Sequence, residues 1–251
     1  MIDSFKLLLA QKKQYIPDLK AARPGERFRG FHHVDRNLCI KCGSCRRSCE
    51  SNAIQGLDGA VDLGKCTFCG NCAAGCSQHA ITFTNFPHTA VDSREKLFIT
   101  PGMGEDDYEK RAIECREDIV KFFGRSLKLR NVSAGGCSAC ELELNACGNV
   151  NFDLSRFGID MVASPRHADG LIITGPVTEN MAYALLETYE TMPDPKVIIA
   201  MGTCAISGGV FAASPALKRD FFDKFKVDLY IPGCPPHPLT VINGLMKFLG
   251  H

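Results

Sequence analysis

The sequence has neither a long apolar run nor a strong excess of charge of one sign. No stretch reaches the length of a membrane span, and the apolar residues 7–10 are too few for the core of an export signal. Hydrophobic residues make up 45% and charged residues 23% of the 251 residues, which is ordinary for a folded protein in water. We therefore expect a cytoplasmic location, where thiols stay reduced.

Motifs for nucleic acids, nucleotides and hydrolysis are also missing. The net charge of +1 gives no bias toward nucleic acid, so we expect no nucleic-acid partner. Neither G-x-G-x-x-G nor G-x-x-x-x-G-K-[ST] occurs, which removes the usual support for nucleotide binding. No G-x-S-x-G nucleophile elbow is present either. We predict no catalytic residue in this chain, so an enzymatic role depends on a partner.

Cysteine, in contrast, is abundant, with 14 residues. Grouped cysteines in a reducing compartment are usually metal ligands. Their distribution divides the chain into an N-terminal docking segment, a cysteine-rich domain, a linker and a second domain, over residues 1–35, 36–84, 85–126 and 127–251. Apolar spacing predicts a helix within 2–14 and another within 105–124. Cys115 has no cysteine near it in sequence and is interpreted as a structural thiol.

The cysteine-rich domain contains an internal repeat. The runs are Cys39-x2-Cys42-x2-Cys45-x3-Cys49 and Cys66-x2-Cys69-x2-Cys72-x3-Cys76, and they repeat after 27 residues. This close repeat predicts two copies of one small unit related by pseudo-twofold symmetry. Each copy is too small to bury its own apolar face, so bound metal would have to supply the missing cohesion.

The spacing of these runs is typical of two-cluster ferredoxins, a small α+β fold. In such runs the fourth cysteine binds the other cluster, which predicts one 4Fe–4S set at Cys39, Cys42, Cys45 and Cys76 and another at Cys66, Cys69, Cys72 and Cys49. Small residues in the loops would let the backbone approach the clusters, with N–H groups directed at sulfur: Gly43, Ser44, Gly70 and Ala73. A zinc interpretation, based on two C-x2-C pairs, leaves cysteines unused.

One departure from the ferredoxin pattern concerns the residues that follow each run. The run normally ends in Cys-Pro, whereas Glu50 and Ser77 follow the last cysteines here. Because all eight ligands are kept, we expect this departure to affect reduction potential and local rigidity more than cluster binding.

Residues 127–251 alternate between strand and helix patterns. Predicted strands cover 127–132, 160–163, 171–174, 196–200 and 227–231, and predicted helices cover 180–189 and 238–249. Such alternation predicts an α/β domain with a mostly parallel sheet and helices on both faces. Loops that follow parallel strands meet at one edge of the sheet, where these folds bind their ligands.

Four further cysteines each follow a predicted strand: Cys137, Cys140, Cys204 and Cys234. Because strand ends meet at one edge, loops far apart in sequence can converge there. Four thiolates at one site suit a third 4Fe–4S cluster or a tetrahedral zinc ion. On geometry alone, a cluster, a zinc ion and separate thiols all remain possible.

A resemblance to a known family narrows the choice between a cluster, a zinc ion and separate thiols. Residues 134–141, 164–169, 174–178, 202–209 and 232–236 resemble the small, cluster-bearing subunit of energy-converting, membrane-associated [NiFe] hydrogenases, including the formate hydrogenlyase type. The same stretches are similar to the related terminal-cluster subunit of respiratory complex I. Residues 36–84 resemble the two-cluster ferredoxin subunit of these complexes, so the chain looks like a fusion of two normally separate subunits.

The resemblance implies a flavodoxin-like domain with a proximal 4Fe–4S cluster on Cys137, Cys140, Cys204 and Cys234. The complex I relative has adjacent cysteines at the first position, whereas Cys137 and Cys140 are separated by two residues, as in hydrogenases. We therefore expect three 4Fe–4S clusters that exchange electrons with a large hydrogenase-type catalytic subunit. No pair of nickel-type C-x2-C motifs remains outside the assigned cysteines, so nickel would belong to that partner.

The implied setting is a complex on the inner face of the cell membrane. It would include membrane subunits and a further iron–sulfur or dehydrogenase subunit that supplies or accepts electrons. Two alternatives remain: a subunit of a complex I-like, quinone-linked enzyme without nickel, and a stand-alone redox or binding protein.

A few other residues have two interpretations each. Glu141 follows a ligand cysteine and is either a proton relay or an ordinary helix-starting acid. Arg166 and His167 would be surface residues, and the resemblance turns their loop toward the large partner subunit. Cys147 is interpreted as a buried thiol rather than an alternate ligand. Thr203 is considered as a donor to a cluster sulfur.

Overall fold

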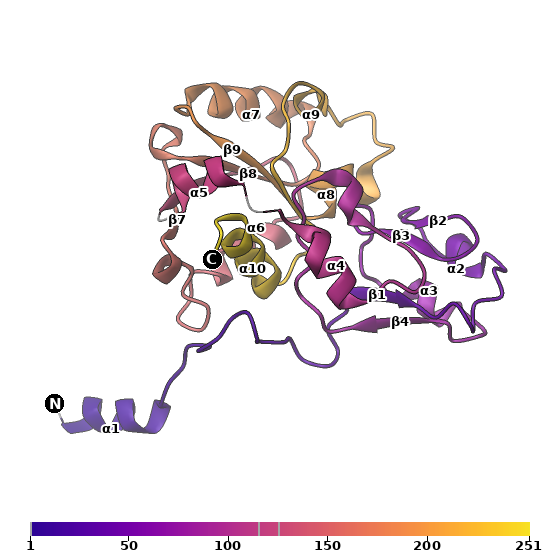
Figure 1. Ribbon diagram of the computed structural model, residues 1–251. Helices are drawn as coiled ribbons and strands as arrows, with labels where there is room; N and C mark the ends of the chain where they lie inside the picture. Colours follow the sequence, from indigo (N-terminus) through magenta and orange to yellow (C-terminus); the bar gives the residue numbers. More distant parts are fainter. Residues whose placement is uncertain (1, 115, 125) are drawn as a thin grey trace.

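The computed structural model describes residues 2–114, 116–124 and 126–251, so Cys115 lies outside the described residues. Figure 1 shows two packed parts, a larger one built on a sheet and a smaller one on the right that holds both cysteine runs. The N-terminal segment runs beneath both of them.

The larger part is a five-stranded parallel sheet. Its strands are β6 (Leu127–Ser133), β7 (Ile159–Met161), β8 (Gly170–Thr174), β9 (Val197–Met201) and β10 (Leu229–Ile231). The spatial order is β10-β9-β8-β6-β7, which is the flavodoxin-like doubly wound order. All five residues of β8 and of β9 are buried, as expected for central strands covered on both faces. The predicted fold class is therefore confirmed, with strand boundaries shifted by one or two residues.

Helices cover both faces of this sheet, as predicted. They are α6 (Ala139–Ala146), α7 (Glu179–Thr191), α8 (Thr203–Ser207), α9 (Asp220–Lys224) and α10 (Pro238–Phe248), with 3-10 turns at Leu154–Phe157, Pro165–His167 and Gly209–Phe211. In Figure 1, α7 and α9 lie on one side of the sheet and α6 and α10 on the other. Nearly every residue of α10 is buried, because the N-terminal segment crosses over it. The Asn243 amide donates to the Leu19 carbonyl at 2.9 Å in this crossing.

The smaller part has the α+β arrangement that the repeat predicts. Strand β1 (Phe31–Val34) pairs antiparallel with β4 (Ile81–Thr84), and β2 (Ile54–Gln55) pairs with β3 (Ala60–Asp62). The short helices α2 (Ser44–Arg47) and α3 (Asn71–Ala74) each follow a left-handed glycine, Gly43 or Gly70, with φ of 71° and 88°. The 27-residue period thus recurs in the backbone (70 minus 43).

The linker does not hold the single helix predicted over 105–124. It forms a 3-10 turn (Arg94–Leu97), β5 (Phe98–Ile99) and two helices, α4 (Glu105–Ala112) and α5 (Glu117–Phe123). The first helix ends because Asp92 competes for the backbone: its N–H donates to the Ala112 carbonyl, and its carboxylate accepts from the Glu114 N–H at 2.8 Å. That part of the prediction is wrong, because a partner distant in sequence interrupts an otherwise helical pattern.

The linker also binds the two parts together. Strand β5 pairs with β3 of the smaller part, while Val91 exchanges two backbone hydrogen bonds with Tyr230 in β10, at 2.9 and 2.8 Å. The N-terminal helix α1 (Ile2–Gln11) is shorter than the predicted 2–14 and points away from both parts (Figure 1). Among the described residues, no helix has the length and apolar character needed to cross a membrane.

Candidate iron–sulfur sites

Each cysteine run in the smaller part contributes three thiols to one cavity and its fourth thiol to the other. Cys39, Cys42, Cys45 and Cys76 line one cavity, which we call site I. Cys49, Cys66, Cys69 and Cys72 line a second cavity, which we call site II. These are the two sets of four that the repeat predicts, including the exchange of the fourth cysteine. Whether each set binds a cluster stays a prediction.

The helices beside sites I and II each begin after a glycine in the left-handed conformation. Gly43 and Gly70 have positive φ values at the start of the helices that carry Cys45 and Cys72, and a Cβ on Gly43 would lie 2.8 Å from the Leu57 side chain. Backbone N–H groups also point at sulfur: Ala53 donates to Cys49 Sγ and Phe68 donates to Cys66 Sγ, each at 3.3 Å. Such donors stabilise thiolate ligands and their clusters.

Burial controls the acidity of the site II thiols. It raises the pKa of Cys66 to about 12 and that of Cys72 to about 11, with a smaller opposing effect from backbone N–H donors. Thiols with such pKa values are neutral at pH 7, so a metal that binds them must displace their protons and supply the compensating positive charge. Cys42 in site I differs, because it is exposed and a hydrogen bond with Ser44 lowers its pKa.

His32 is a site II residue that the sequence did not reveal. It is fully buried on β1, lines the cavity, and places Nε2 3.7 Å from Cys72 Sγ. Burial lowers its pKa to about 4, so the imidazole is neutral. Because a thiolate only accepts hydrogen bonds, a deprotonated Cys72 requires the tautomer with hydrogen on Nε2. The sequence alone does not show which of the two adjacent histidines, His32 or His33, faces site II.

The four C-terminal cysteines converge at the carboxyl edge of the large sheet, and we call this group site III. They are Cys137 before α6, Cys140 within α6, Cys204 in α8, and Cys234 after β10. Burial raises the pKa of Cys140 to about 12 and that of Cys204 to about 11, and the other thiols of the group raise both further. The loops of Cys204 and Cys234 are joined by a hydrogen bond from the Thr203 N–H to the Gly233 carbonyl at 2.9 Å.

Two glycines allow the close approach in site III. A Cβ on Gly202, whose φ is 88°, would lie 2.5 Å from Cys140 Sγ, and a Cβ on Gly209 would lie 2.9 Å from Cys204 Sγ. Real Cβ atoms do not approach sulfur this closely, so both positions require glycine. The Gly202-Thr-Cys and Ser-Gly-Gly sequences are therefore explained by space around the sulfurs.

A half-buried cation, Arg219, lies beside site III. Arg219 donates to the carbonyls of Cys204, Ala205 and Ile206, at 3.1, 2.7 and 3.1 Å, and so binds the end of the short helix α8. Burial lowers its pKa, but a guanidinium remains charged at neutral pH. A positive charge at this position favours thiolate at Cys204. The sequence offered no motif from which this residue could be found.

Glu141 and Cys147, the other residues singled out near site III, are held by hydrogen bonds. Burial opposes ionisation of Glu141, but hydrogen bonds from Ser133 and Thr174 outweigh burial, so its pKa is lowered. The Thr174 hydroxyl donates to Glu141 Oε1 at 2.6 Å. This carboxylate therefore anchors α6 to the sheet, and a relay role stays a prediction. Cys147 is fully buried and its thiol donates to the Glu143 carbonyl.

The remaining predicted residues divide into two groups. Arg166 and His167 are exposed, as expected for a surface loop. Thr203 is buried at 1% exposure, and its hydroxyl donates to backbone carbonyls of Cys66 and Gly233. The expectation that it donates to a cluster sulfur is therefore replaced by a contact between two cysteine loops.

The cysteine lining of sites I and II is of the kind that holds 4Fe–4S clusters. Over residues 2–114, 116–124 and 126–251, no three His, Cys, Asp or Glu side chains are grouped closely enough to bind one metal ion. In sites I and II the thiols instead surround cavities. A 4Fe–4S cube is held by four thiolates around a body of this kind, so the residues present fit that group.

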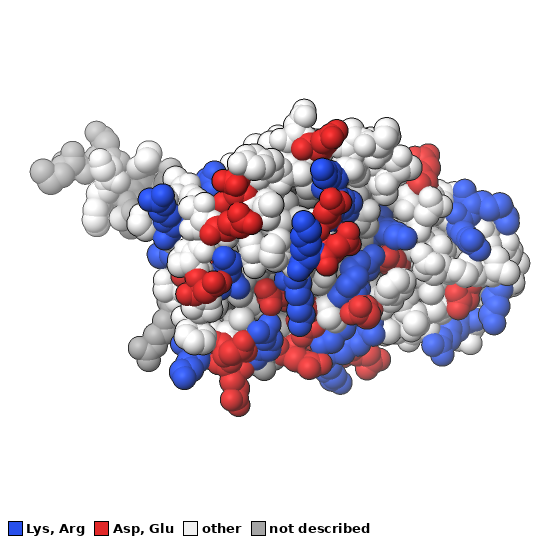
Figure 2. Space-filling model, turned by 90° about the horizontal axis from the view of Figure 1, so that it is seen from above, with Lys and Arg blue, Asp and Glu red and all other residues white. Residues whose placement is uncertain are grey.

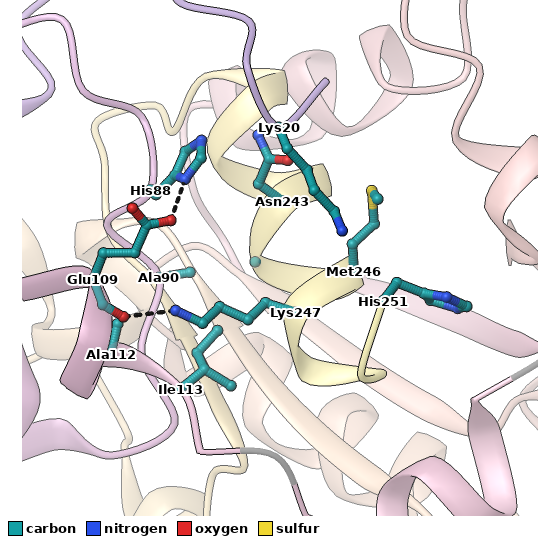
Figure 3. Close-up of a pocket in the computed structure, with 11 residues that line it drawn as sticks. Lys20, His88, Ala90, Glu109, Ala112, Ile113, Asn243, Met246, Lys247 and His251 are labelled. Atoms are coloured by element: carbon teal, nitrogen blue, oxygen red, sulfur yellow. Dashed lines mark hydrogen bonds and ion pairs between the residues drawn. The ribbon is translucent and has the colours of Figure 1, made fainter. Parts of the chain in front are cut away.

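A further cavity, of about 200 Å³, lies away from all twelve of these cysteines. Figure 3 shows it between α4 and α10, with His88 and Glu109 on one wall and Lys20 and Met246 on the other. His88 Nδ1 and Glu109 Oε1 are 2.6 Å apart, and Lys247 donates to the Glu109 carbonyl. These contacts attach the linker helix α4 to the C-terminal helix α10.

Comparison with known proteins supports the assignment of both parts. Residues 137–248 match the family described as NADH ubiquinone oxidoreductase, 20 Kd subunit, and residues 32–55 match the 4Fe-4S binding domain. A probable membrane-bound hydrogenase subunit, mbhJ, of Pyrococcus furiosus is 40% identical over 142 residues, which are 56% of this chain and 85% of the relative.

Two further relatives represent different complexes. Formate hydrogenlyase subunit 7 of Escherichia coli is 41% identical over 135 residues, covering 54% of this chain and 53% of the relative. An NADH-quinone oxidoreductase subunit of a Geobacter species is 47% identical over 112 residues, covering 45% of this chain and 65% of the relative. Identity alone therefore does not separate hydrogenase relatives from complex I relatives.

Proposed function

The chain belongs to the NADH ubiquinone oxidoreductase 20 Kd subunit family, and on that premise we propose that it carries electrons through three 4Fe–4S clusters to or from a [NiFe] hydrogenase-type catalytic subunit. At the coarser level it is an electron-transfer iron–sulfur subunit of hydrogenase or complex I-like complexes. The observation that carries the finer proposal is the gathering of twelve cysteines into three groups of four, each with space or glycine beside the sulfurs.

When bound, each cluster would supply reversible one-electron chemistry. The chain's own residues would hold the clusters and fix the order in which the three sites follow one another. Site II occupies the middle, because the loop of Cys66 contacts the loop of Gly233 beside site III through Thr203. Site I adjoins site II, since helix α2, which carries Cys45, packs on helix α3, which carries Cys72.

Site III is the candidate contact with the catalytic subunit. Cys137 and Cys234 are exposed, and so are Arg166 and His167 in a loop after β7. An exposed proximal site lets an active site on a partner approach the cluster. Nickel would be bound by that partner, because all twelve gathered cysteines of this chain have a place in sites I, II and III.

Site I is the candidate contact with the electron donor or acceptor. Large apolar side chains are exposed beside it, with Leu38, Ile40 and Leu57 at 48%, 63% and 55% exposure. Exposed basic residues lie next to them: Lys41, Arg46 and Arg47. Figure 2 shows Lys and Arg outnumbering acidic side chains at this end of the molecule, on the right. We propose that a further iron–sulfur or dehydrogenase subunit docks here.

The proposed location is the cytoplasmic face of the cell membrane, where membrane subunits of the complex would hold the chain. The relative named above as a membrane-bound hydrogenase subunit and the NADH-quinone oxidoreductase relative support this location. A complex I-like role without nickel is the second candidate, and the 47% identity to the Geobacter protein favours it. The two-residue separation of Cys137 and Cys140 favours the hydrogenase role.

Metal analysis of the complex purified anaerobically through this chain tests the proposal. We expect about twelve iron per chain, the content of three four-iron clusters, together with nickel in the partner and H2-dependent dye reduction. The same iron without nickel or H2 activity would move the assignment to the complex I-like role. Iron near eight per chain with added zinc would mean that site III holds no cluster.

A further inference from the structure

The Thr203 hydroxyl joins the loops of two different cysteine groups. It lies 2.8 Å from the Cys66 carbonyl oxygen and 3.1 Å from the Gly233 carbonyl oxygen. Cys66 belongs to site II, whereas Cys204 directly follows Thr203 and Cys234 directly follows Gly233 in site III. One side chain, at 1% exposure, therefore spans the boundary between the two sites.

The surrounding contacts hold this boundary tightly. A Cβ on Gly64, two residues before Cys66, would lie 2.8 Å from Ile206 Cγ2 in α8, so the backbone of the Cys66 loop packs directly on that helix. A cleft beside it is lined by both Cys69 of site II and Cys234 of site III. Sites II and III therefore face each other across a short, packed boundary that Thr203 crosses.

We propose that Thr203 is a positioning residue whose hydroxyl provides the hydrogen-bonded contact for electron exchange between the cluster of site II and the cluster of site III. This inference rests on the proposed function, because it requires clusters in both sites. In the exchange one electron leaves one cluster, which is oxidised, and enters the other, which is reduced. No bond of Thr203 breaks, and its proton stays on the hydroxyl oxygen.

The hydroxyl matters because electronic coupling falls steeply with the gap between atoms. The hydrogen bond brings Thr203 Oγ1 to 2.8 Å from the Cys66 oxygen. A methyl group in its place would retreat to van der Waals contact at about 3.5–4.0 Å. Valine at position 203 would thus keep the shape of the side chain while widening the gap on the Cys66 side.

Three variants of the full chain in its complex separate these effects. Thr203→Val removes the hydroxyl and keeps the shape, whereas Thr203→Ser keeps the hydroxyl and removes the methyl group. Ser207→Ala is the matched control, because the Ser207 hydroxyl donates to the Thr203 carbonyl inside α8 and crosses no boundary. Each sample is first analysed for iron and for the electron paramagnetic resonance signals of the three clusters.

The measurement is the rate at which an electron redistributes among the clusters after a brief photochemical reduction, followed by freeze-quench resonance spectroscopy. We expect Thr203→Val to slow exchange between sites II and III several-fold, with exchange between sites I and II unchanged. Thr203→Ser and Ser207→Ala should behave as wild type. The magnetic splitting between reduced clusters II and III should be the same in all samples, which shows that their separation has not changed.

The inference is overturned if Thr203→Val exchanges electrons between sites II and III as fast as wild type. It is overturned as well if Thr203→Ser slows exchange as much as Thr203→Val, because packing of the methyl group would then be the cause. If Thr203→Val fails to assemble three clusters, Thr203→Ala takes its place, because it also removes the hydroxyl, and wild-type exchange in that variant overturns the inference. Fewer than three clusters in wild type would instead contradict the proposed function, and the two failures are thereby distinguished.

Discussion

The two parts of the molecule place their cysteines differently with respect to their cores. In the smaller part Cys45, Cys66 and Cys72 are themselves buried core residues, and the strands around them are only two to four residues long. In the larger part the core consists of β8 and β9 with their covering helices, and Cys137 and Cys234 lie exposed at its rim. Three of the grouped cysteines thus belong to the core of the smaller part, whereas Cys137 and Cys234 lie outside the core of the larger part.

Removing iron should therefore produce the largest difference in stability between the two parts. Treatment with an iron chelator under reducing conditions should unfold the smaller part, because its short elements bury too little apolar surface without metal. The large sheet should stay folded. Hydrogen exchange measures this directly: amides of β1 and β4 should lose protection, while amides of β8 and β9 keep theirs. Equal loss in both sheets, or none in either, would contradict the distinction.

Replacing single cysteines should produce the next largest effect. Cys204→Ser should remove about four iron per chain and leave the smaller part folded with two clusters. Cys49→Ser should remove a similar amount, but from site II, where it accompanies Cys66, rather than from the site of its own run. Cys147→Ser, outside the three groups, serves as control and should keep full iron. Resonance spectra of individual clusters would show damage confined to site I if the exchanged ligation is wrong.

A buried ion pair supplies cohesion to the smaller part that does not depend on iron. Asp62, at 1% exposure, accepts from both terminal nitrogens of Arg94 at 2.8 and 2.5 Å and from the Gly64 N–H at 2.9 Å. Asp62→Asn should weaken the charged hydrogen bonds to Arg94, which is half-buried, and cost about 1.5–3 kcal/mol.

The matched change in the larger part is Asp160→Asn, which disrupts the exposed pair with Lys128. It should cost about 0–1 kcal/mol. Denaturant unfolding of the iron-loaded protein, followed separately in each part, measures both values. Equal costs would show that the Asp62 pair is not specially protected from water.

The smallest effect concerns the potential of one cluster. His32→Phe should remove the donor to Cys72 and make the site II cluster harder to reduce, by roughly tenfold in the reduction equilibrium, which is about 59 mV for one electron. His33→Phe, on the opposite side of β1, should leave the potential unchanged. Redox titration of the resonance signals measures both, and a shared shift would mean that the imidazole contact is not the cause.

Sequence reasoning succeeded where the signal was local or strictly periodic. The apolar runs at Leu171 and Val197 predicted strands, because continuous apolar residues suit a parallel sheet covered on both faces. The 27-residue repeat predicted the two groups of four in the smaller part, since identical spacing imposes identical loops. The structure shows the same repeat in backbone angles, with Lys41 and Phe68 both at φ of 55°.

Sequence reasoning failed where the structure or role of a residue depends on a contact with a residue distant in sequence. The helical pattern over 105–124 is real, but Asp92 interrupts it from outside the pattern. His32 and Arg219 have no motif around them, because their roles depend on which sulfur the fold brings close. Thr203 was noticed only for its position before Cys204, and its acceptors lie 137 and 30 residues away.

The pairing of Val91 with Tyr230 has a further consequence for the edge of the large sheet. An uncovered outer strand presents free N–H and C=O groups that can template the strand of another molecule. Here the linker occupies those groups of β10 at Tyr230, so the chain covers its own edge at that point. The linker thereby also hinders edge-to-edge aggregation at the β10 edge of the large sheet.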